Sequence, residues 1–244
     1  MKKLIVALLL LTITMIHAND ELWFRAKEIA ENPSHLIPTR SIYETKLGGS
    51  ENLLKMAGLS ATDVTITVSH TMTEDGTIEN AIVSAVNNLA TPGSRSSRMV
   101  DEELIEAAKS IDVAAIADSI PIGSMFTESD NKKITVRRLR ETKNIDGHSC
   151  VAYDVRYSES GKRADQIRVK MWIDTTTAAL ITVETKPLGQ SAGEDFTIYF
   201  HNIYNEQTNS LQLYKFRLVG KKVYMNMIVD IESVTTFEDF VEKG

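Results

Sequence analysis

Apolar and polar residues alternate over most of the second half of the chain. In residues 169–184, VKMWIDTTTAALITVE, Val169, Met171 and Ile173 fall on one face, and a second apolar stretch follows a short polar break. Side chains that repeat every two residues are typical of a β-strand with one buried face. This stretch therefore predicts a hairpin that lays a large apolar face against a core or an apolar ligand.

The same alternation predicts seven strands in the C-terminal part, separated by short turns rich in Gly, Asp, Asn and Thr. The expected strands are 132–144, 148–158, 166–174, 180–186, 195–204, 210–218 and 222–236. A further hairpin is expected at 64–86, turning at Glu-Asp-Gly, with every second residue from Ile78 to Val86 on one face. Connections this short join antiparallel neighbours, which predicts a meander rather than a parallel sheet.

Two other stretches carry apolar residues at helical spacing. Residues 20–31 begin with Asp20 as the expected N-cap and end before Asn32 and Pro33, and residues 99–116 repeat apolar side chains until Pro121. Residues 37–59, which contain Pro38 and the stretch GGSENLL, predict irregular chain.

These elements predict an α+β fold. An antiparallel sheet of about nine strands twists and curls strongly rather than staying flat. We therefore expect a strongly curved antiparallel sheet that forms an incomplete β-barrel, with the helices docked on its concave face.

The first residues have the layout of an export signal. MKKLIVALLLLTITMIHA places two lysines before an apolar stretch from Leu4 to Ile16, and Ala18 stands before a polar segment. This order is typical of a cleavable signal peptide, and the stretch is shorter than the roughly 20 apolar residues of a membrane-spanning helix. We expect residues 1–18 to be the signal and residues 19–244 to form one periplasmic domain; an uncleaved anchor is the alternative.

Charge and cysteine content narrow the function classes. The net charge is -6, and loss of Lys2 and Lys3 with the signal would make it -8, which argues against binding a nucleic-acid backbone. The basic run KKITVRRLR (132–140) alternates over both faces of a strand, so we interpret it as a solvated sheet face rather than an anionic-lipid patch. The single cysteine, Cys150, is expected to be a core residue.

No sequence motif for catalysis is present. The chain has no G-x-S-x-G elbow, no P-loop and no dinucleotide-binding glycine motif. His148 and Cys150 lie two residues apart, but a zinc site needs four ligands. We therefore expect a non-enzymatic protein with no catalytic residue, no metal and no cofactor.

Two stretches, IDGHSCVAYDVRY and IRVKMWIDTTTAALITVETKP, resemble the central region of bacterial outer-membrane lipoprotein-sorting proteins, the Lol-type periplasmic carriers and their relatives. In that family a glycine turn leads into a strand with a tyrosine, and the next strand ends in W-x-D. The matching residues here are Gly147, Cys150, Tyr153, Val155, Trp172, Ile173 and Asp174. The tail at 200–240 is similar to the family's last strands, whereas the family's N-terminal Arg-Pro strand motif has no match.

The resemblance implies a half-barrel whose apolar concave face, covered by helices, receives the acyl chains of lipoproteins or lipids. Membrane proteins of the inner or outer membrane would be further partners. The residues expected to line this apolar cavity are Val151, Tyr153, Val155, Val169, Met171 and Ile173. The alternatives are a protein-interaction or sensor module whose concavity is filled by its own helices, and a hydrolase without a sequence signature.

Overall fold

The computed structural model describes residues 20–32, 34, 36–49, 63–72, 78–87, 122–128, 132–159, 167–186, 193–224 and 227–242. The expected signal peptide and the expected helix at 99–116 lie outside these residues. None of the helices in these ranges is long and apolar enough to cross a membrane.

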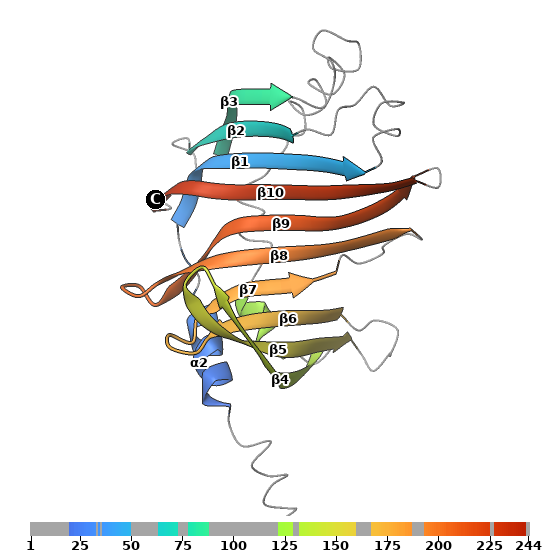
Figure 1. Ribbon diagram of the computed structural model, residues 1–244. Helices are drawn as coiled ribbons and strands as arrows, with labels where there is room; N and C mark the ends of the chain where they lie inside the picture. The colour runs from blue at the N-terminus through green and yellow to red at the C-terminus, as the bar shows by residue number, and fades with distance from the viewer. Residues whose placement is uncertain are drawn as a thin grey trace, which may run out of the picture.

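Ten strands form one antiparallel sheet in the order β3-β2-β1-β10-β9-β8-β7-β6-β5-β4 (Figure 1). The strands are β1 (Leu36–Gly49), β2 (Asp63–Met72), β3 (Ile78–Asn87), β4 (Lys132–Ile145), β5 (His148–Glu159), β6 (Ile167–Asp174), β7 (Leu180–Thr185), β8 (Glu194–Asn205), β9 (Ser210–Tyr224) and β10 (Met227–Glu242). Every neighbour in the sheet is also a neighbour in the chain except β1, which pairs with β10. That pairing joins the N-terminal hairpin to the C-terminal meander.

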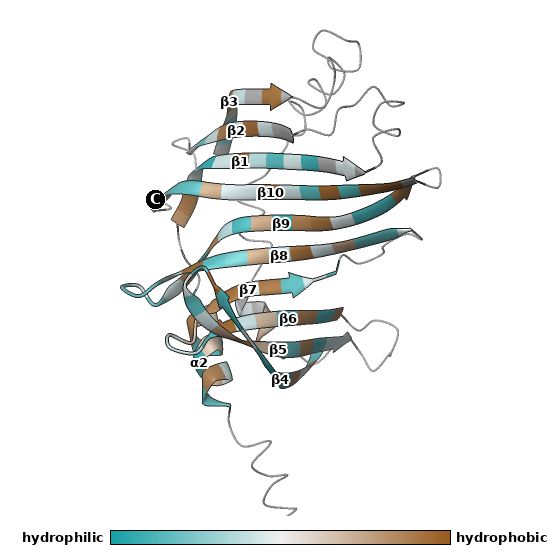
Figure 2. Cartoon of the chain, in the orientation of Figure 1, coloured by the Kyte–Doolittle hydropathy of each residue, from teal (hydrophilic) through white to brown (hydrophobic). Residues whose placement is uncertain are grey.

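The sheet register separates two faces. Directly opposed residues share a face, and one continuous row runs across the sheet through Arg138, Tyr153, Met171, Val183, Phe200, Phe216, Thr235, Tyr43, Ile66 and Ala85. We call the side that carries this row the apolar face. The next row, on the opposite side, holds Arg137, Asp154, Lys170, Glu184, Tyr199, Arg217, Val234, Glu44, Thr65 and Val86, and we call that side the charged face. Figure 2 shows the resulting alternation of hydrophobic and hydrophilic residues along the strands.

One α-helix, α2 (Glu21–Ala30), packs on the apolar face beside the short 3₁₀ helix η1 (Ile122–Met125). The helix begins and ends where the sequence predicts, although the Asp20 side chain makes no capping hydrogen bond and instead pairs with Arg138 across 3.4 Å. Ala26, Ile29 and Ala30 are buried in one hydrophobic cluster with residues of β5, β6 and β7 and with Leu211 of β9, and the helix contacts β6 and β9. The docking of helices on the concave side remains a prediction.

The sheet curves most strongly at the β4–β5 hairpin. Its two-residue turn has Asp146 at φ 50° and Gly147 at φ 89°, the left-handed pair that a tight hairpin turn requires. The Tyr214 hydroxyl on β9 donates a hydrogen bond of 2.8 Å to Asp146, so the hairpin tip reaches a strand four places away from β5 in the sheet (Figure 1). The expected curved antiparallel meander is therefore confirmed, with ten strands in place of about nine.

Three sequence predictions about the elements are wrong. Residues 36–49 form strand β1, not irregular chain; Pro38 is accommodated because β2 pairs with β1 only from Arg40 onward. Residues 219–222 lie inside β9 rather than in a turn, since Gly220 sits directly opposite Phe196. A bulge in β3, with Val83 as the extra residue between the partners of Thr67 and Val68, turns Ser84 and Val86 away from the face that Asn80 and Ile82 share.

Candidate functional site

The six residues predicted to line a cavity come together on the apolar face. They form three directly opposed pairs between β5 and β6: Val151 with Ile173, Tyr153 with Met171, and Val155 with Val169. All six are 4% exposed or less and belong to one hydrophobic cluster. Their place in the core follows from the sheet register, while their contact with a ligand remains a prediction.

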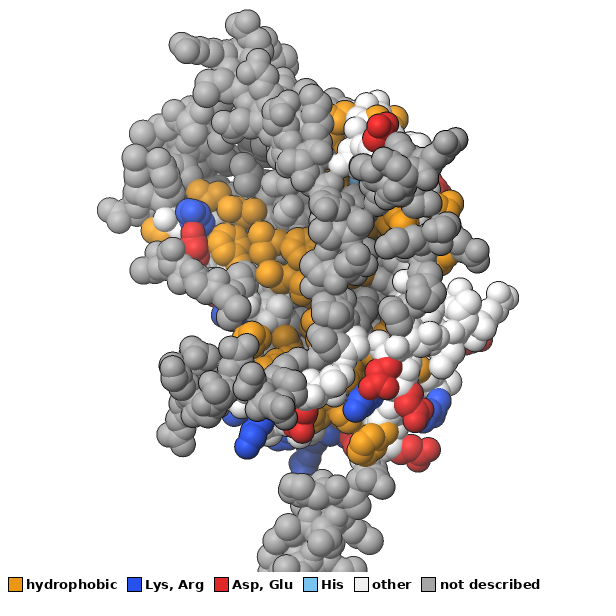
Figure 3. All heavy atoms as spheres, turned by 180° about the vertical axis from the view of Figure 1, so that it is seen from behind, with side chains coloured by type: hydrophobic (Ala, Val, Ile, Leu, Met, Phe, Trp, Pro, Cys, Tyr) orange, Lys and Arg blue, Asp and Glu red, His pale blue; other side chains and the backbone are white. Residues whose placement is uncertain are grey.

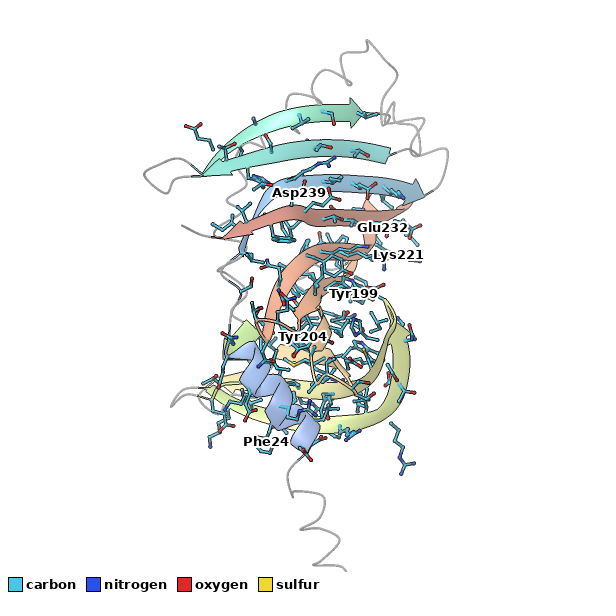
Figure 4. All side chains as sticks on the ribbon, turned by 90° about the vertical axis from the view of Figure 1, so that its left-hand side faces the viewer. Phe24, Tyr199, Tyr204, Lys221, Glu232 and Asp239 are labelled. Atoms are coloured by element: carbon cyan, nitrogen blue, oxygen red, sulfur yellow. The ribbon has the colours of Figure 1, made fainter. Side chains whose placement is uncertain are left out.

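Aromatic rings join α2 to this cluster. The Trp23 ring lies 4.6 Å from that of Phe126 and 5.4 Å from that of Tyr153, measured between ring centroids. The Tyr157 hydroxyl donates a hydrogen bond of 2.8 Å to the carbonyl of Met125, which fixes η1 at the same place. The helix and η1 together therefore cover the apolar face over β5 and β6, as Figure 4 shows for α2 with Phe24 on its outer side.

The apolar face continues beyond this cover into β8, β9 and β10. Its side chains there are only partly buried: Ile198, Phe200, Phe216, Leu218, Val229 and Ile231. The rings of Phe200 and Phe216 lie 5.4 Å apart. Figure 3, the view from behind, shows hydrophobic side chains gathered in the middle of this surface. The sequence predicted the alternation in these strands, but the pairing that aligns them with β5 and β6 is a property of the whole sheet.

Tyr153 brings a polar group into this apolar surface. Its hydroxyl is buried and has no hydrogen-bond partner among the described residues. Burial, and after it the nearby Asp20 carboxylate, raises the pKa of Tyr153 far above its usual value. The hydroxyl therefore stays protonated near neutral pH, with the Asp20 carboxylate as its nearest charged neighbour.

A separate polar cluster connects β1, β2 and β3. The Nε2 atom of His70 lies 2.6 Å from the Ser41 hydroxyl, and its Nδ1 atom lies 2.7 Å from the Asn80 carbonyl oxygen. Because Asn80 accepts the Nδ1 proton, Nε2 accepts the proton of Ser41. This is the relation between nucleophile, base and orienting group of a serine hydrolase, but Ser41 is 0% exposed and no substrate can approach it in this structure. The cluster holds three strands together; sequence reasoning missed it because its residues lie on three different strands.

The W-x-D turn organises the β6–β7 connection. Asp174 is 3% exposed and accepts hydrogen bonds from the Thr177 hydroxyl at 2.7 Å and from the backbone N–H of Thr176 at 3.3 Å. Burial alone would raise the pKa of Asp174, but these bonds, with one from His148, outweigh it and hold that pKa below its usual value. The side chain therefore acts as an ionised anchor of the turn, and Trp172 packs in the core.

Cys150 is a buried core residue with a free thiol, as the sequence predicts. Burial, followed by the charges of Asp174 and Asp146, raises the pKa of Cys150 to about 12. The thiol is therefore protonated near neutral pH and a poor nucleophile. In the described part of the chain, no three His, Cys, Asp or Glu side chains are grouped so that they could hold a metal ion.

No protein-family model and no curated protein sequence matches the chain. Among solved structures it is similar to an outer-membrane lipoprotein-sorting protein domain from Vibrio parahaemolyticus, with 9% identity, coverage of 90% of this chain and 91% of the other, and a TM-score of 0.35. It is also similar to a LolA superfamily protein from Nitrosomonas europaea (8% identity, 90% and 91% covered, TM-score 0.33). A DUF1329 family protein from Desulfovibrio piger follows (10% identity, 91% and 93% covered, TM-score 0.32).

Two of these three structures bear the name of the family that the strand motifs resemble. Identities of 10% or less leave no residue-by-residue correspondence, and at TM-scores of 0.35 or less the backbones overlap only loosely.

Proposed function

We propose that this protein is a periplasmic carrier of the lipoprotein-sorting type, which binds an acyl chain of a lipoprotein or lipid against the apolar face of its sheet. The observation that supports this most is the continuity of that face. It runs from the helix-covered pairs of β5 and β6 to the partly exposed Phe200, Phe216 and Leu218. The bound chain would lie between the sheet and the helical segments that cover it.

Transfer energies support an acyl chain as the ligand. Each CH₂ group moved from water into an apolar site gains about 0.8 kcal/mol, so a long chain binds well without any polar recognition. Phenylalanine, leucine and isoleucine side chains on β8–β10 offer such a surface.

The expected location and partners follow from the carrier role. The N-terminal segment has the layout of a cleavable export signal, which would deliver residues 19–244 to the periplasm. There a carrier would take its cargo from one membrane and deliver it to another, so inner- and outer-membrane proteins are the expected partners.

Two neighbouring residues of β9 give a matched test. Leu218 lies on the apolar face and Val219 on the charged face, and both are partly buried. We expect Leu218→Asn to weaken the binding of an apolar fluorescent probe about tenfold, because a buried leucine contributes roughly 1.5–3 kcal/mol. Val219→Asn should leave probe binding unchanged. Probe titrations on the purified mature protein, with thermal unfolding to verify folding, measure both.

Mass spectrometry of organic extracts from natively purified protein identifies the cargo. Recovery of fatty acyl species, together with the expected difference between the two variants, supports the carrier. An extract without lipid and no uptake of the probe would contradict it. That result would favour the alternative function, a periplasmic interaction or sensor module whose apolar face is filled by its own helices, and a protein partner should then be recoverable by crosslinking.

A further inference from the structure

Three arginines surround one buried carboxylate on the charged face of β4, β5 and β6. Asp154 is 4% exposed, and Arg137 and Arg156 each place an Nη2 atom 3.2 Å from its Oδ2. Arg168 donates through Nε to the other carboxylate oxygen at 2.5 Å. The arginine side chains themselves are 64%, 45% and 62% exposed, so all three open to solvent.

The charges of this arginine cluster do not balance. Three guanidinium groups and one carboxylate leave a formal charge of +2, in a chain whose net charge is -6. Two lysines of the neighbouring strand segments have carboxylate partners of their own, since Lys170 pairs with Glu141 at 3.0 Å and Lys186 with Asp195 at 2.7 Å. The excess positive charge is therefore carried by Arg137, Arg156 and Arg168, because the one carboxylate of Asp154 neutralises only one of the three guanidinium groups.

Two of the three arginines face each other across neighbouring strands. Arg156 and Arg168 are directly opposed across β5 and β6, and like charges in that position repel. Asp154 offsets part of this repulsion and fixes the three guanidinium groups in one place. Burial alone would raise the pKa of Asp154, but the hydrogen bonds and charges of Arg168 and Arg156 outweigh it, so its pKa lies below the usual value.

Each guanidinium has five N–H donors in a planar fork. The structure gives each of the three one hydrogen bond to Asp154, and the exposure of their side chains leaves the other donors accessible to solvent. A guanidinium fork can bind a phosphate group in a bidentate way. A phosphate monoester also has three terminal oxygens and two negative charges, which match three arginines with an excess charge of +2 better than a carboxylate does.

We propose that Arg137, Arg156 and Arg168 form a binding site for a doubly charged phosphate group. The group can belong to a soluble phosphate ester or to the headgroup of an anionic lipid, since both present the same oxygens. The site is on the face of the sheet opposite the apolar face, so it does not depend on the carrier role proposed above.

Inorganic phosphate is the first probe, titrated into the isotope-labelled mature protein at constant ionic strength. We expect amide resonances of β4–β6 to shift and to saturate. Arg168→Gln should weaken this binding about tenfold, as should Arg137→Gln. The matched control is Arg217→Gln, which removes the same charge from the same face but from a one-to-one pair with Glu232; Tyr199 and Glu232 mark this part of the face in Figure 4. The control should bind phosphate like the wild type.

Vesicles distinguish the two sources of the phosphate group. Co-sedimentation with vesicles that contain phosphatidic acid, whose phosphate is a monoester, absent with phosphatidylcholine and lost in Arg168→Gln, assigns the site to lipid headgroups. Binding of inorganic phosphate without vesicle binding assigns it to soluble phosphate esters. No saturable shift with phosphate, or equal weakening in Arg168→Gln and Arg217→Gln, would overturn the proposal. Thermal unfolding of each variant verifies that it is folded. If one of the two cluster variants, Arg168→Gln or Arg137→Gln, does not fold, the other tests the same site.

Discussion

At the scale of single residues, buried polar groups are ordered by their neighbours rather than by water. His70 is 4% exposed and lies between Ser41 and Asn80. Burial lowers the pKa of His70 below 6.5, although the hydrogen bond to Asn80 opposes this shift. The imidazole is therefore neutral in the folded protein near neutral pH, as its acceptor role toward Ser41 requires.

The position of His70 predicts that stability falls in mild acid. In the unfolded chain the imidazole titrates near 6.5, so below this pH the unfolded state takes up a proton that the folded state resists. The free energy of unfolding should therefore be lower at about pH 5.5 than at about pH 7.5. Urea unfolding at both pH values measures the change. His70→Gln cannot take up this proton and should show a smaller change, and an equal change in both proteins would contradict the assignment.

At the scale of elements, alternation bounded by turn residues predicted most of the C-terminal strands well. It located β5, β6, β7 and β8 to within one or two residues. It failed for β1, because Pro38 and the pair Gly48 and Gly49 are typical of loops. Pairing with β10 nevertheless holds this stretch in a strand. It also failed within β9, where Gly220 and two lysines gave a turn signal although the lysines pair with Asp230 and Glu194 on neighbouring strands.

Position 220 in strand β9 requires a glycine, because the neighbouring backbone of β8 leaves no room for a side chain. A Cβ atom there would lie 2.2 Å from the Asp195 carbonyl oxygen and 2.6 Å from the Phe196 Cα atom. We expect Gly220→Ala to lower the free energy of unfolding by about 2 kcal/mol or more, because β8 has to move. Gly147→Ala is the control: nothing lies within 4 Å of its Cβ and only the positive φ resists, so it should cost about 1 kcal/mol. Denaturant unfolding measures both, and equal losses would contradict the steric explanation.

At the scale of the whole molecule, the six residues predicted to line a cavity lie side by side because their strands follow one another in the chain. The β5–β6 pairing is local, so alternation alone aligned Val151, Tyr153 and Val155 with Val169, Met171 and Ile173. The arginine cluster also lies on sequential strands, but the sequence does not show that Asp154 is buried beneath it. The Ser41–His70–Asn80 cluster was missed because Ser41 lies in a stretch that was expected to be irregular. The apolar surface of β8–β10 was missed because the expected turn within β9 would have given β9 and β10 another register.

The core is unevenly distributed over the sheet, which predicts a gradient of local stability. Among the described residues, eight of the ten largest fully buried side chains lie in β5–β7, and only Val68 and Ser41 lie elsewhere. Regions with many buried contacts open least often, so amide hydrogens of β6 and β7 should exchange most slowly with solvent. Those of β2 and β3, at the far edge of the sheet, should exchange faster.

Hydrogen exchange followed by mass spectrometry measures this gradient and also connects it to the carrier role. The partly exposed apolar surface of β8–β10 lies between the two regions, and an apolar ligand that binds there should slow exchange in β8–β10 more than in β2–β3. Uniform protection along the sheet would contradict the gradient. A ligand that binds but leaves β8–β10 unchanged would place its site away from the apolar face, because burial of a chain against these strands has to restrict their opening.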